Sequence, residues 1–389
     1  MKALKRWNYL DVVILIMGLA LALAIRFSLL SFKSSDYFAY TRGWYNTLRQ
    51  EGFSAFGKNF ANYNLPYLYL LYGIARFLPD LPGWVAAKIP SMVADFVSAW
   101  FAFRIVRLKH AASPFPLLAA LGVLFAPTVV LNSAFWGQAD ALYTSALIAC
   151  LYFLLIRKNA LAMLMFGISI AFKAQGIFLL PLLLGLLLRG EISWKYWLLV
   201  PAVMLLAIVP ALLAGRSLVD LLLIYPAQAG QYDQLSMHAP SFYAWIPDSG
   251  SVFASFYPAG LVIAATIALL FCMAVSRSPI ELTPSILLEL AVISVMLMPF
   301  FLPKMHERYF YVADVLSILL PFFIPAYFFV PILMSVLSFF AYQPTLFGTE
   351  PVPIGVLALG VFLLIVILTR DALLRLYETP GGTRPPQTQ

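Results

Sequence analysis

Charged residues are scarce in this sequence, and cysteine is almost absent. Charged side chains make up 11% of the 389 residues and hydrophobic ones 62%, and the mean hydropathy is +0.90. A soluble domain carries roughly a quarter charged residues, so this composition argues against one. The two cysteines, Cys150 and Cys272, lie within apolar runs, which indicates buried thiols rather than a disulfide framework.

Long apolar runs take up most of the chain. Runs of about 17–25 residues recur along it, and each is long enough to cross about 30 Å of hydrocarbon. We therefore expect an all-α polytopic membrane protein with about twelve transmembrane helices. One domain should cover residues 1–376, and the Pro-, Gly- and Thr-rich residues 377–389 should form a disordered cytoplasmic tail.

The basic residues predict the orientation of these spans. The N-terminal segment 1–6 carries three of them, which favours an inner N-terminus followed by an uncleaved first span. Arg and Lys clusters then recur at alternate loops, so both termini fall inside. The formal net charge of +8 is explained by loop anchoring rather than by nucleic-acid binding. Two long loops, 31–83 and 215–255, are predicted on the outer side.

The first outer loop has its own helical pattern. Tyr37, Tyr40, Trp44 and Leu48 are spaced to share one helical face, with basic and amide residues on another. An apolar stretch over 59–79 follows, interrupted at Pro66. We expect two helices lying in the membrane interface here.

Unusual polar residues gather at the outer ends of the predicted spans. Ionisable groups at membrane depth are costly and usually face a protein cavity. We therefore predict a shared outer site. Its members are Asp36, Trp136, Gln138, Asp140, Lys173, Gln175, Lys304, His306, Glu307, Arg308 and Tyr309.

Each of these residues also has an ordinary structural explanation. Asp36 follows two serines and suits a helix N-cap. Trp136 suits an interfacial aromatic belt and Lys173 suits snorkelling to the headgroups. His306, Glu307 and Arg308 suit an interfacial ion cluster. Deeper in the spans, Asp95 and Glu289 suit helix–helix contacts. In the second outer loop, Asp233 and His238 suit solvated positions.

The cationic block suggests a chemistry for the site. Lys304, His306 and Arg308 offer three potential cations within five residues, a pattern suited to phosphate. A phosphate at the mouth of a hydrophobic groove implies a lipid phosphate. Asp36 would then accept a proton from an attacking hydroxyl, as in glycosyl transfer from a lipid phosphate.

The same residues resemble a known family. Ser35-Asp36-Tyr37, Trp136-Gly137-Gln138 with Asp140, Lys173-Ala174-Gln175 and His306-Glu307-Arg308-Tyr309 resemble motifs of the GT-C superfamily of membrane glycosyltransferases. Within it, the chain is most similar to bacterial homologues of the second mannosyltransferase of the GPI-anchor pathway. The similarity covers roughly residues 10–320.

The resemblance implies a GT-C-type fold and an inverting hexosyltransferase, mannose-like in its sugar, at the outer face of a bacterial inner membrane. It implies a polyprenyl-phosphate sugar as donor and a lipid or glycan as acceptor. Whether a partner subunit is needed stays open at this point. Asp36 takes the role of base, and Lys304, His306 and Arg308 hold the donor phosphate. The pocket for the sugar or acceptor is assigned to Trp136, Gln138, Asp140, Lys173, Gln175, Glu307 and Tyr309.

The chain departs from the family at one point. Many members carry two acidic residues after the first span, whereas this chain has Ser34-Ser35-Asp36. From that departure we predict no essential metal and no cofactor.

Two other classes of function remain open from the sequence. A transporter or lipid flippase fits an even number of spans with both ends inside, although transporters place their sites near the bilayer midplane between repeats. A structural membrane subunit would leave the one-sided polar cluster unexplained.

Overall fold

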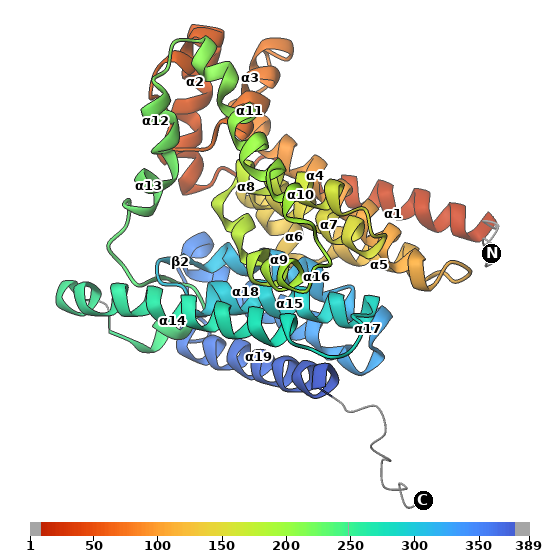
Figure 1. The fold of residues 1–389 in the computed structure, drawn as a ribbon. Coiled ribbons are helices and arrows are strands. Elements are labelled where there is room, and N and C mark those ends of the chain that lie inside the picture. Colours follow the sequence, from red (N-terminus) through yellow and green to blue (C-terminus); the bar gives the residue numbers. More distant parts are fainter. Residues whose placement is uncertain (1–8, 248, 378–389) are drawn as a thin grey trace, which may run out of the picture.

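The computed structural model describes residues 9–247 and 249–377, which are helical apart from two short strands (Figure 1). The first half contains α1 (Tyr9–Ser28), α2 (Arg42–Glu51), α3 (Leu65–Phe77), α4 (Gly83–Lys109), α5 (Phe115–Phe125), α6 (Pro127–Val130), α7 (Asp140–Leu155), α8 (Asn159–Phe172) and α9 (Leu180–Leu188). Short π or 3-10 turns lie between them, at η1 (Tyr37–Thr41), η2 (Gly52–Gly57), η3 (Leu131–Trp136) and η4 (Ala174–Leu179).

The second half contains α10 (Trp194–Trp197), α11 (Leu199–Leu213), α12 (Leu218–Leu222), α13 (Ile224–Ala229), α14 (Gly250–Ser276), α15 (Pro284–Phe301), α16 (Tyr311–Ser317), α17 (Leu320–Phe323), α18 (Phe329–Phe347) and α19 (Ile354–Tyr377). Its 3-10 turns are η5 (Phe242–Trp245), η6 (Glu307–Phe310) and η7 (Pro325–Tyr327). Strands β1 (Ser236–Met237) and β2 (Met305–His306) pair in parallel. The predicted tail lies outside the described residues, except for Tyr377, which ends α19.

Within the described residues, seven helical segments are long and apolar enough to cross a membrane. They are α1, α4, α10–α11, α14, α15, η7–α18 and α19. The bent pair formed by α5 and Pro127–Trp136, with an angle of 49° between its halves, makes an eighth if it counts as one span.

The predicted count of about twelve spans exceeds this number. Apolar helices do occupy the other predicted segments, but α7 has 16 residues and α8 has 14. At a rise of 1.5 Å per residue they extend about 24 and 21 Å, less than the hydrocarbon thickness of about 30 Å. Hydropathy located these helices correctly, and a count of twelve spans, in which α7 and α8 would also cross the membrane, stays a prediction.

The long helices pack as two adjoining groups. In the first half α4 contacts α5 and α7, and α7 contacts α8. In the second half α15 contacts α14, α16 and α19; Figure 1 shows α14, α15 and α19 side by side. Contacts of α15 with α7, and of α16 with α7, join the groups.

The basic loops predicted to lie inside contact one another at the opposite ends of these helices. Arg189 donates to the backbone oxygens of Ser278 at 2.7 Å and Ile280 at 2.9 Å. Lys109 donates to the backbone oxygen of Phe323 at 2.7 Å, which ties the two halves together. These contacts hold the basic loops together at one end of the helices, and their placement on the inner side stays a prediction.

The first outer loop forms two helices where the sequence predicts them. In α2, Trp44 and Leu48 are buried while Arg42, Asn46 and Arg49 are exposed, as the spacing predicts. The interruption expected at Pro66 is instead the start of α3, because proline suits the first turn of a helix, where its missing N–H costs nothing.

Candidate functional site

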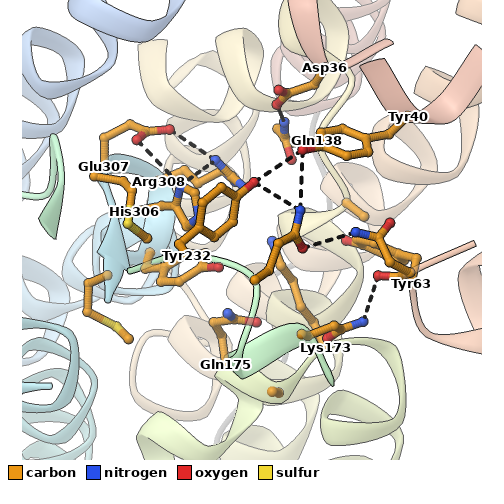
Figure 2. Close-up of a pocket in the computed structure, with 18 of the residues that line it drawn as sticks. Asp36, Tyr40, Tyr63, Gln138, Lys173, Gln175, Tyr232, His306, Glu307 and Arg308 are labelled. Carbon is orange, nitrogen blue, oxygen red and sulfur yellow. Dashed lines mark hydrogen bonds and ion pairs between the residues drawn. The ribbon is translucent and has the colours of Figure 1, made fainter. Parts of the chain in front are cut away.

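A cavity of about 540 Å³ opens where the two predicted outer loops meet the helix ends (Figure 2). Its walls come from the two outer loops, the segment after α1, the start of α4, η3, the link from α8 to η4, the first half of α14, the link after α15, and Thr345 near the end of α18. The volume lies in the usual range for a small-molecule site. The polar residues that sequence reasoning placed on one side therefore converge on one space.

Asp36 lies on this cavity, and its carboxylate is fixed in place. Its Oδ2 accepts hydrogen bonds from the indole Nε1 of Trp136 at 3.0 Å and from the Nε2 of Gln138. Asp36 makes no side-chain capping bond to the following turn. The role of helix cap is therefore wrong for Asp36, and the residue that contacts the backbone N–H of Tyr37 is Ser34, at 3.3 Å.

Trp136 and Gln138 line the cavity as predicted, but their polar groups hold the carboxylate. The Trp136 side chain is almost fully buried, so it is not an interfacial belt residue. Gly137 between them has a positive φ of 81°, and a Cβ there would meet the Lys88 side chain at 3.2 Å. A left-handed turn and a close approach both favour glycine at this position.

Asp140 is the centre of a buried ion cluster just beneath the cavity. It accepts hydrogen bonds from the Lys173 ammonium and from the Nδ2 of Asn132, the latter at 3.0 Å. The Nε of Arg308 lies 3.8 Å from its Oδ2. Since Asp140 is fully buried and the Lys173 side chain is only 9% exposed, Lys173 does not snorkel to the headgroups.

Strand β2 places the cationic block against the second outer loop. Met305 and His306 pair with Ser236 and Met237 of β1, and the backbone N–H of Lys304 donates to Leu235 at 2.8 Å. Lys304 and His238, at the borders of this small sheet, both have positive φ values, 63° and 54°. Such conformations are uncommon outside glycine, and the pairing of the two segments maintains them.

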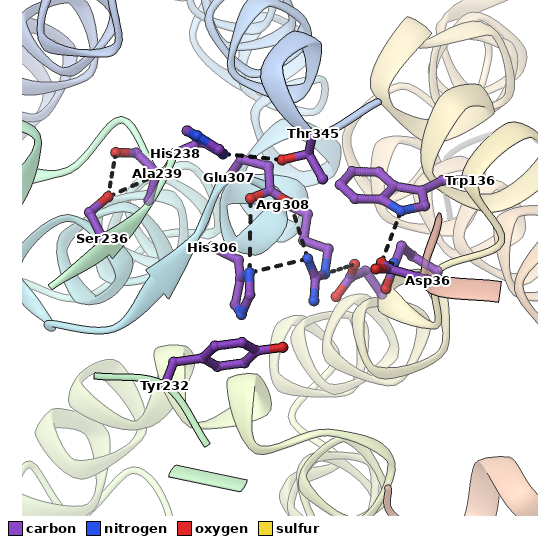
Figure 3. A network of polar contacts seen from close by, with 12 residues as sticks. Asp36, Trp136, Tyr232, Ser236, His238, Ala239, His306, Glu307, Arg308 and Thr345 are labelled. Atoms are coloured by element: carbon purple, nitrogen blue, oxygen red, sulfur yellow. Dashed lines mark hydrogen bonds and ion pairs between the residues drawn. The ribbon is translucent and has the colours of Figure 1, made fainter. Parts of the chain in front are cut away.

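Arg308 is the cation that this arrangement presents to the cavity (Figure 3). It donates to Glu307 Oε1 at 3.0 Å, and its guanidinium lies 5.5 Å from the centre of a Trp136 ring. Burial lowers the pKa of Arg308, but Glu307 and then Tyr309, Asp140 and Asp36 outweigh it and raise that pKa above its ordinary value. Arg308 is therefore always charged.

His306 and Lys304 differ from the prediction of three clustered cations. Burial, followed by the neighbouring Arg308 and Lys173, lowers the pKa of His306 to about 2, so its imidazole is neutral at physiological pH. The Lys304 ammonium donates to the backbone oxygen of Ala229 at 3.0 Å and lies 3.8 Å from Asp233. Arg308 and Lys173 are thus the cations closest to Asp140.

The remaining predicted residues are Glu307, Gln175 and Tyr309, and all three line the cavity. Glu307 is buried, and burial raises the pKa of its carboxyl against the opposing effect of Arg308. Gln175 and Tyr309 line the cavity, and the Oε1 of Gln175 is buried without a hydrogen-bond partner among the described residues. The Lys173 ammonium lies 5.3 Å from the Tyr309 ring.

The structure also brings in residues that sequence reasoning did not select. The Lys88 ammonium donates to the backbone oxygens of Leu29 at 3.0 Å, Leu30 at 3.3 Å and Phe32 at 2.8 Å, which caps the end of α1 just before Asp36. A single lysine within an apolar span could have indicated it, but its partners are backbone oxygens that no sequence pattern identifies. Asn62, Tyr63 and Gln231 also line the cavity and were equally unselected, because each is ordinary in a loop.

Asp95 and Glu289 lie outside the cavity and make structural contacts. Asp95 pairs with Arg26 at 2.8 Å, and both side chains are fully buried. Glu289 accepts hydrogen bonds from Tyr327 at 2.7 Å and Arg375 at 2.5 Å. The prediction of helix–helix contacts is confirmed for both residues.

Among the described residues, no group of three or more His, Cys, Asp or Glu side chains has an arrangement that could hold a metal ion.

No protein-family model matches this chain, and no curated protein matches it. Among solved structures, it is similar to the crystal structure of ArnT from Cupriavidus metallidurans bound to undecaprenyl phosphate. The sequence identity is 14% and the TM-score is 0.48; the match covers 92% of this chain and 77% of ArnT.

Proposed function

We propose that this protein is a membrane glycosyltransferase that transfers a sugar from a polyprenyl-phosphate donor to an acceptor hydroxyl. The observation that carries the proposal is a fixed carboxylate facing a buried cation across one cavity. Asp36 is held by two donors, and its charge is near enough to Arg308 to influence the pKa of that residue. This is the pairing of a base with an anion-binding group that the reaction requires.

The contacts leave part of the Asp36 carboxylate available for chemistry. Both hydrogen bonds that described residues donate to it fall on Oδ2, so Oδ1 serves as the base. As the acceptor hydroxyl attacks the anomeric carbon, its proton passes to Oδ1 and a new carbon–oxygen bond forms. The bond between the anomeric carbon and the donor phosphate breaks, and both of its electrons leave with the phosphate. Attack from the face opposite the leaving group inverts the anomeric configuration.

Arg308 and Lys173 receive the charge of the leaving phosphate in this mechanism. Arg308 is already oriented by Glu307, while its Nε makes no hydrogen bond to the described residues. Because a guanidinium can donate two parallel bonds to a phosphate, Arg308 is suited to the lipid phosphate. Lys304 also lines the cavity, but its ammonium is engaged by the backbone oxygen of Ala229 and is not given a role at the phosphate.

The position of the cavity distinguishes this proposal from transport. All the walls of the cavity come from one set of helix ends and the two loops beside them, whereas transporter sites lie near the bilayer midplane. We assign the cavity to the outer, periplasmic side of a bacterial inner membrane, with a twelve-pass chain in which the shorter helices complete the count. A mannose-like hexose is the proposed sugar, on the resemblance of the motifs to GPI-pathway mannosyltransferases.

The decisive experiment replaces the base. Asp36→Asn keeps the shape of the side chain and removes the proton acceptor, so transfer from a polyprenyl-phosphate hexose should fall by about 10²–10⁴-fold, the contribution typical of general-base catalysis. Transfer is measured with purified protein in proteoliposomes, and donor binding is measured on the same sample. The exposed Asp80→Asn, away from the cavity, is the matched control. A folded Asp36→Asn variant with full activity would refute the assignment, and lipid flipping without an acceptor would favour the flippase.

Metal removal tests the prediction drawn from the missing second acidic residue. Exhaustive chelation should leave the transfer rate unchanged, because Arg308 and Lys173 supply the positive charge at the phosphate. A loss of activity that Mg²⁺ or Mn²⁺ restores would contradict this prediction.

A further inference from the structure

One wall of the cavity carries no formal charge. The described lining residues contributed by segments 37–67 and 225–232 are aromatic, amide, hydroxyl or alanine side chains. The charged lining residues, Asp36, Lys88, Lys173, Lys304, Glu307 and Arg308, all come from other segments. We call Tyr40, Trp44, Asn62, Tyr63, Gln231 and Tyr232 the neutral wall. Figure 2 shows Tyr40 and Tyr63 on the side of the cavity away from His306, Glu307 and Arg308.

Aromatic rings form a continuous strip on this wall. The Tyr40 and Trp44 ring centres are 6.0 Å apart, and those of Trp44 and Tyr63 are 5.4 Å apart. Aromatic faces carry partial negative charge and therefore attract the weakly positive C–H groups of a sugar ring. They offer no comparable attraction to a carboxylate.

The amides of the wall complement hydroxyl groups. Asn62 donates to Gln231 at 3.0 Å, and Gln231 donates to the hydroxyls of Tyr40 at 3.3 Å and Tyr232 at 3.2 Å. Asn62 and Gln231 are exposed, so each of these bonds contributes little net stability. Because a sugar hydroxyl both donates and accepts, it can enter such a network without leaving an amide unpaired.

The neutral wall adjoins both parts of the proposed reaction centre. Tyr40 lies one helical turn after Asp36, within η1. The Tyr232 hydroxyl is 3.3 Å from that of Tyr40, and the Tyr232 ring centre is 5.3 Å from that of His306. A ligand on the wall is thus next to Asp36 on one side and to the cationic block on the other.

We propose that the neutral wall is a binding subsite for an uncharged sugar ring and that this sugar is the acceptor. The assignment of this sugar as the acceptor rests on the proposed function. The sugar-binding subsite is inferred from the residues of the neutral wall alone. The acceptor class is therefore a glycan or glycolipid headgroup with a neutral sugar at its reactive end.

Direct binding tests the subsite without requiring turnover. Methyl glycosides of neutral hexoses are titrated onto the full-length protein in lipid nanodiscs and followed by saturation-transfer NMR, with a methyl hexuronide as the charged comparator. The neutral glycosides should bind at least about tenfold more tightly than the hexuronide, because the wall has no cation to pair with a buried carboxylate. Tighter binding of the hexuronide would overturn the proposal.

Substitutions then test whether the hexose binds at the neutral wall. Gln231→Ala and Tyr63→Ala should each weaken hexose binding by about tenfold, the effect of losing a hydrogen-bonded or stacked partner. Gln50→Ala removes an exposed amide of α2 that does not line the cavity, and should change hexose binding by less than about twofold. Hexose binding that none of these variants changes, or no hexose binding at all, would overturn the subsite.

A second probe separates this proposal from the proposed function. Undecaprenyl phosphate should bind equally well to wild type, Gln231→Ala and Tyr63→Ala, because its phosphate is assigned to Arg308 and Lys173, which neither substitution removes. If it binds and hexoses do not, the donor assignment stands and the neutral-wall subsite fails. If hexoses bind and it does not, the donor assignment fails and the subsite is supported.

Discussion

Two buried ion clusters in this protein differ in how completely their polar atoms are paired. Between the helices, Arg26 donates to Asp95 and to the backbone oxygens of Ala22 and Leu124. Asp95 also accepts bonds from Ser133 and Tyr311. Beside the cavity, the Nε of Arg308 and the Oε1 of Gln175 are buried without hydrogen-bond partners among the described residues.

The difference separates a structural role from a functional one. A buried charge with every hydrogen bond made stabilises one arrangement, and it can take on no ligand without losing a partner. A buried polar group left unpaired costs free energy that a ligand can recover. Arg26 and Asp95 therefore serve packing, and under the proposed function the cluster around Arg308 serves binding.

The largest expected effect comes from breaking the structural pair. Asp95→Ala leaves the buried Arg26 charge unpaired, which should lower the free energy of unfolding by about 3–5 kcal/mol. Thermal unfolding in detergent measures the loss. The double variant Arg26→Met with Asp95→Leu should recover most of it, since no charge remains to be paired. A double variant as unstable as Asp95→Ala would show that the cluster is not a simple ion pair.

Arg308→Lys, in contrast to Asp95→Ala, should lower catalytic efficiency strongly and stability only slightly. The positive charge beside Glu307 and Asp140 remains, so the free energy of unfolding should change by less than about 1 kcal/mol. The two-pronged contact with phosphate is lost, and kcat/KM should fall by about 10²–10³-fold, the cost typical of removing one donor to a developing anion. Steady-state transfer kinetics and thermal unfolding of one preparation distinguish the two effects. A variant that loses stability but keeps its catalytic efficiency would place Arg308 with the structural pair.

The smallest expected effect concerns pH. The pKa of His306 is about 2 in the folded protein and close to 6.5 when unfolded, so the unfolded state binds the extra proton. The contribution of His306 is therefore fully present above about pH 6.5 and is lost progressively as the pH falls toward 2. His306→Gln should flatten this part of the stability profile between pH 7 and 5. An unchanged slope in thermal unfolding would mean that the folded imidazole takes up its proton over the same pH range as the unfolded one.

Much of the site followed from sequence because it depends on chain topology. Asp36, Trp136, Lys173 and Arg308 were expected to converge since each ends or begins an apolar run on the same side of the membrane. The detailed partners depend on side-chain direction, which a linear pattern does not contain. The capping contact suggested for Asp36 is made by Ser34, whose hydroxyl accepts from the backbone N–H of Tyr37, while the Asp36 side chain makes none.

The cationic block shows where such reasoning fails. Three potential cations within five residues suggested that Lys304, His306 and Arg308 act together, but the Lys304 ammonium donates to the backbone oxygen of Ala229. Burial removes the charge of His306. Neither effect can be inferred from residue types, because both depend on the segment that β1 brings alongside. Hydropathy likewise does not reveal the surroundings of α7, whose residues are mostly buried and which contacts α4, α8 and α16.

The pairing of β1 with β2 has a consequence for how the protein is made. The two strands are separated in the chain by α14 and α15, so β1 has no partner until both helices have been synthesised and inserted. Until then β1, in the second outer loop, has no strand to pair with. The part of the cavity wall that follows α15 is also missing. A chain that ends before β2 would therefore contain Asp36 but lack Arg308, so the proposed site requires synthesis of the chain through β2 and η6.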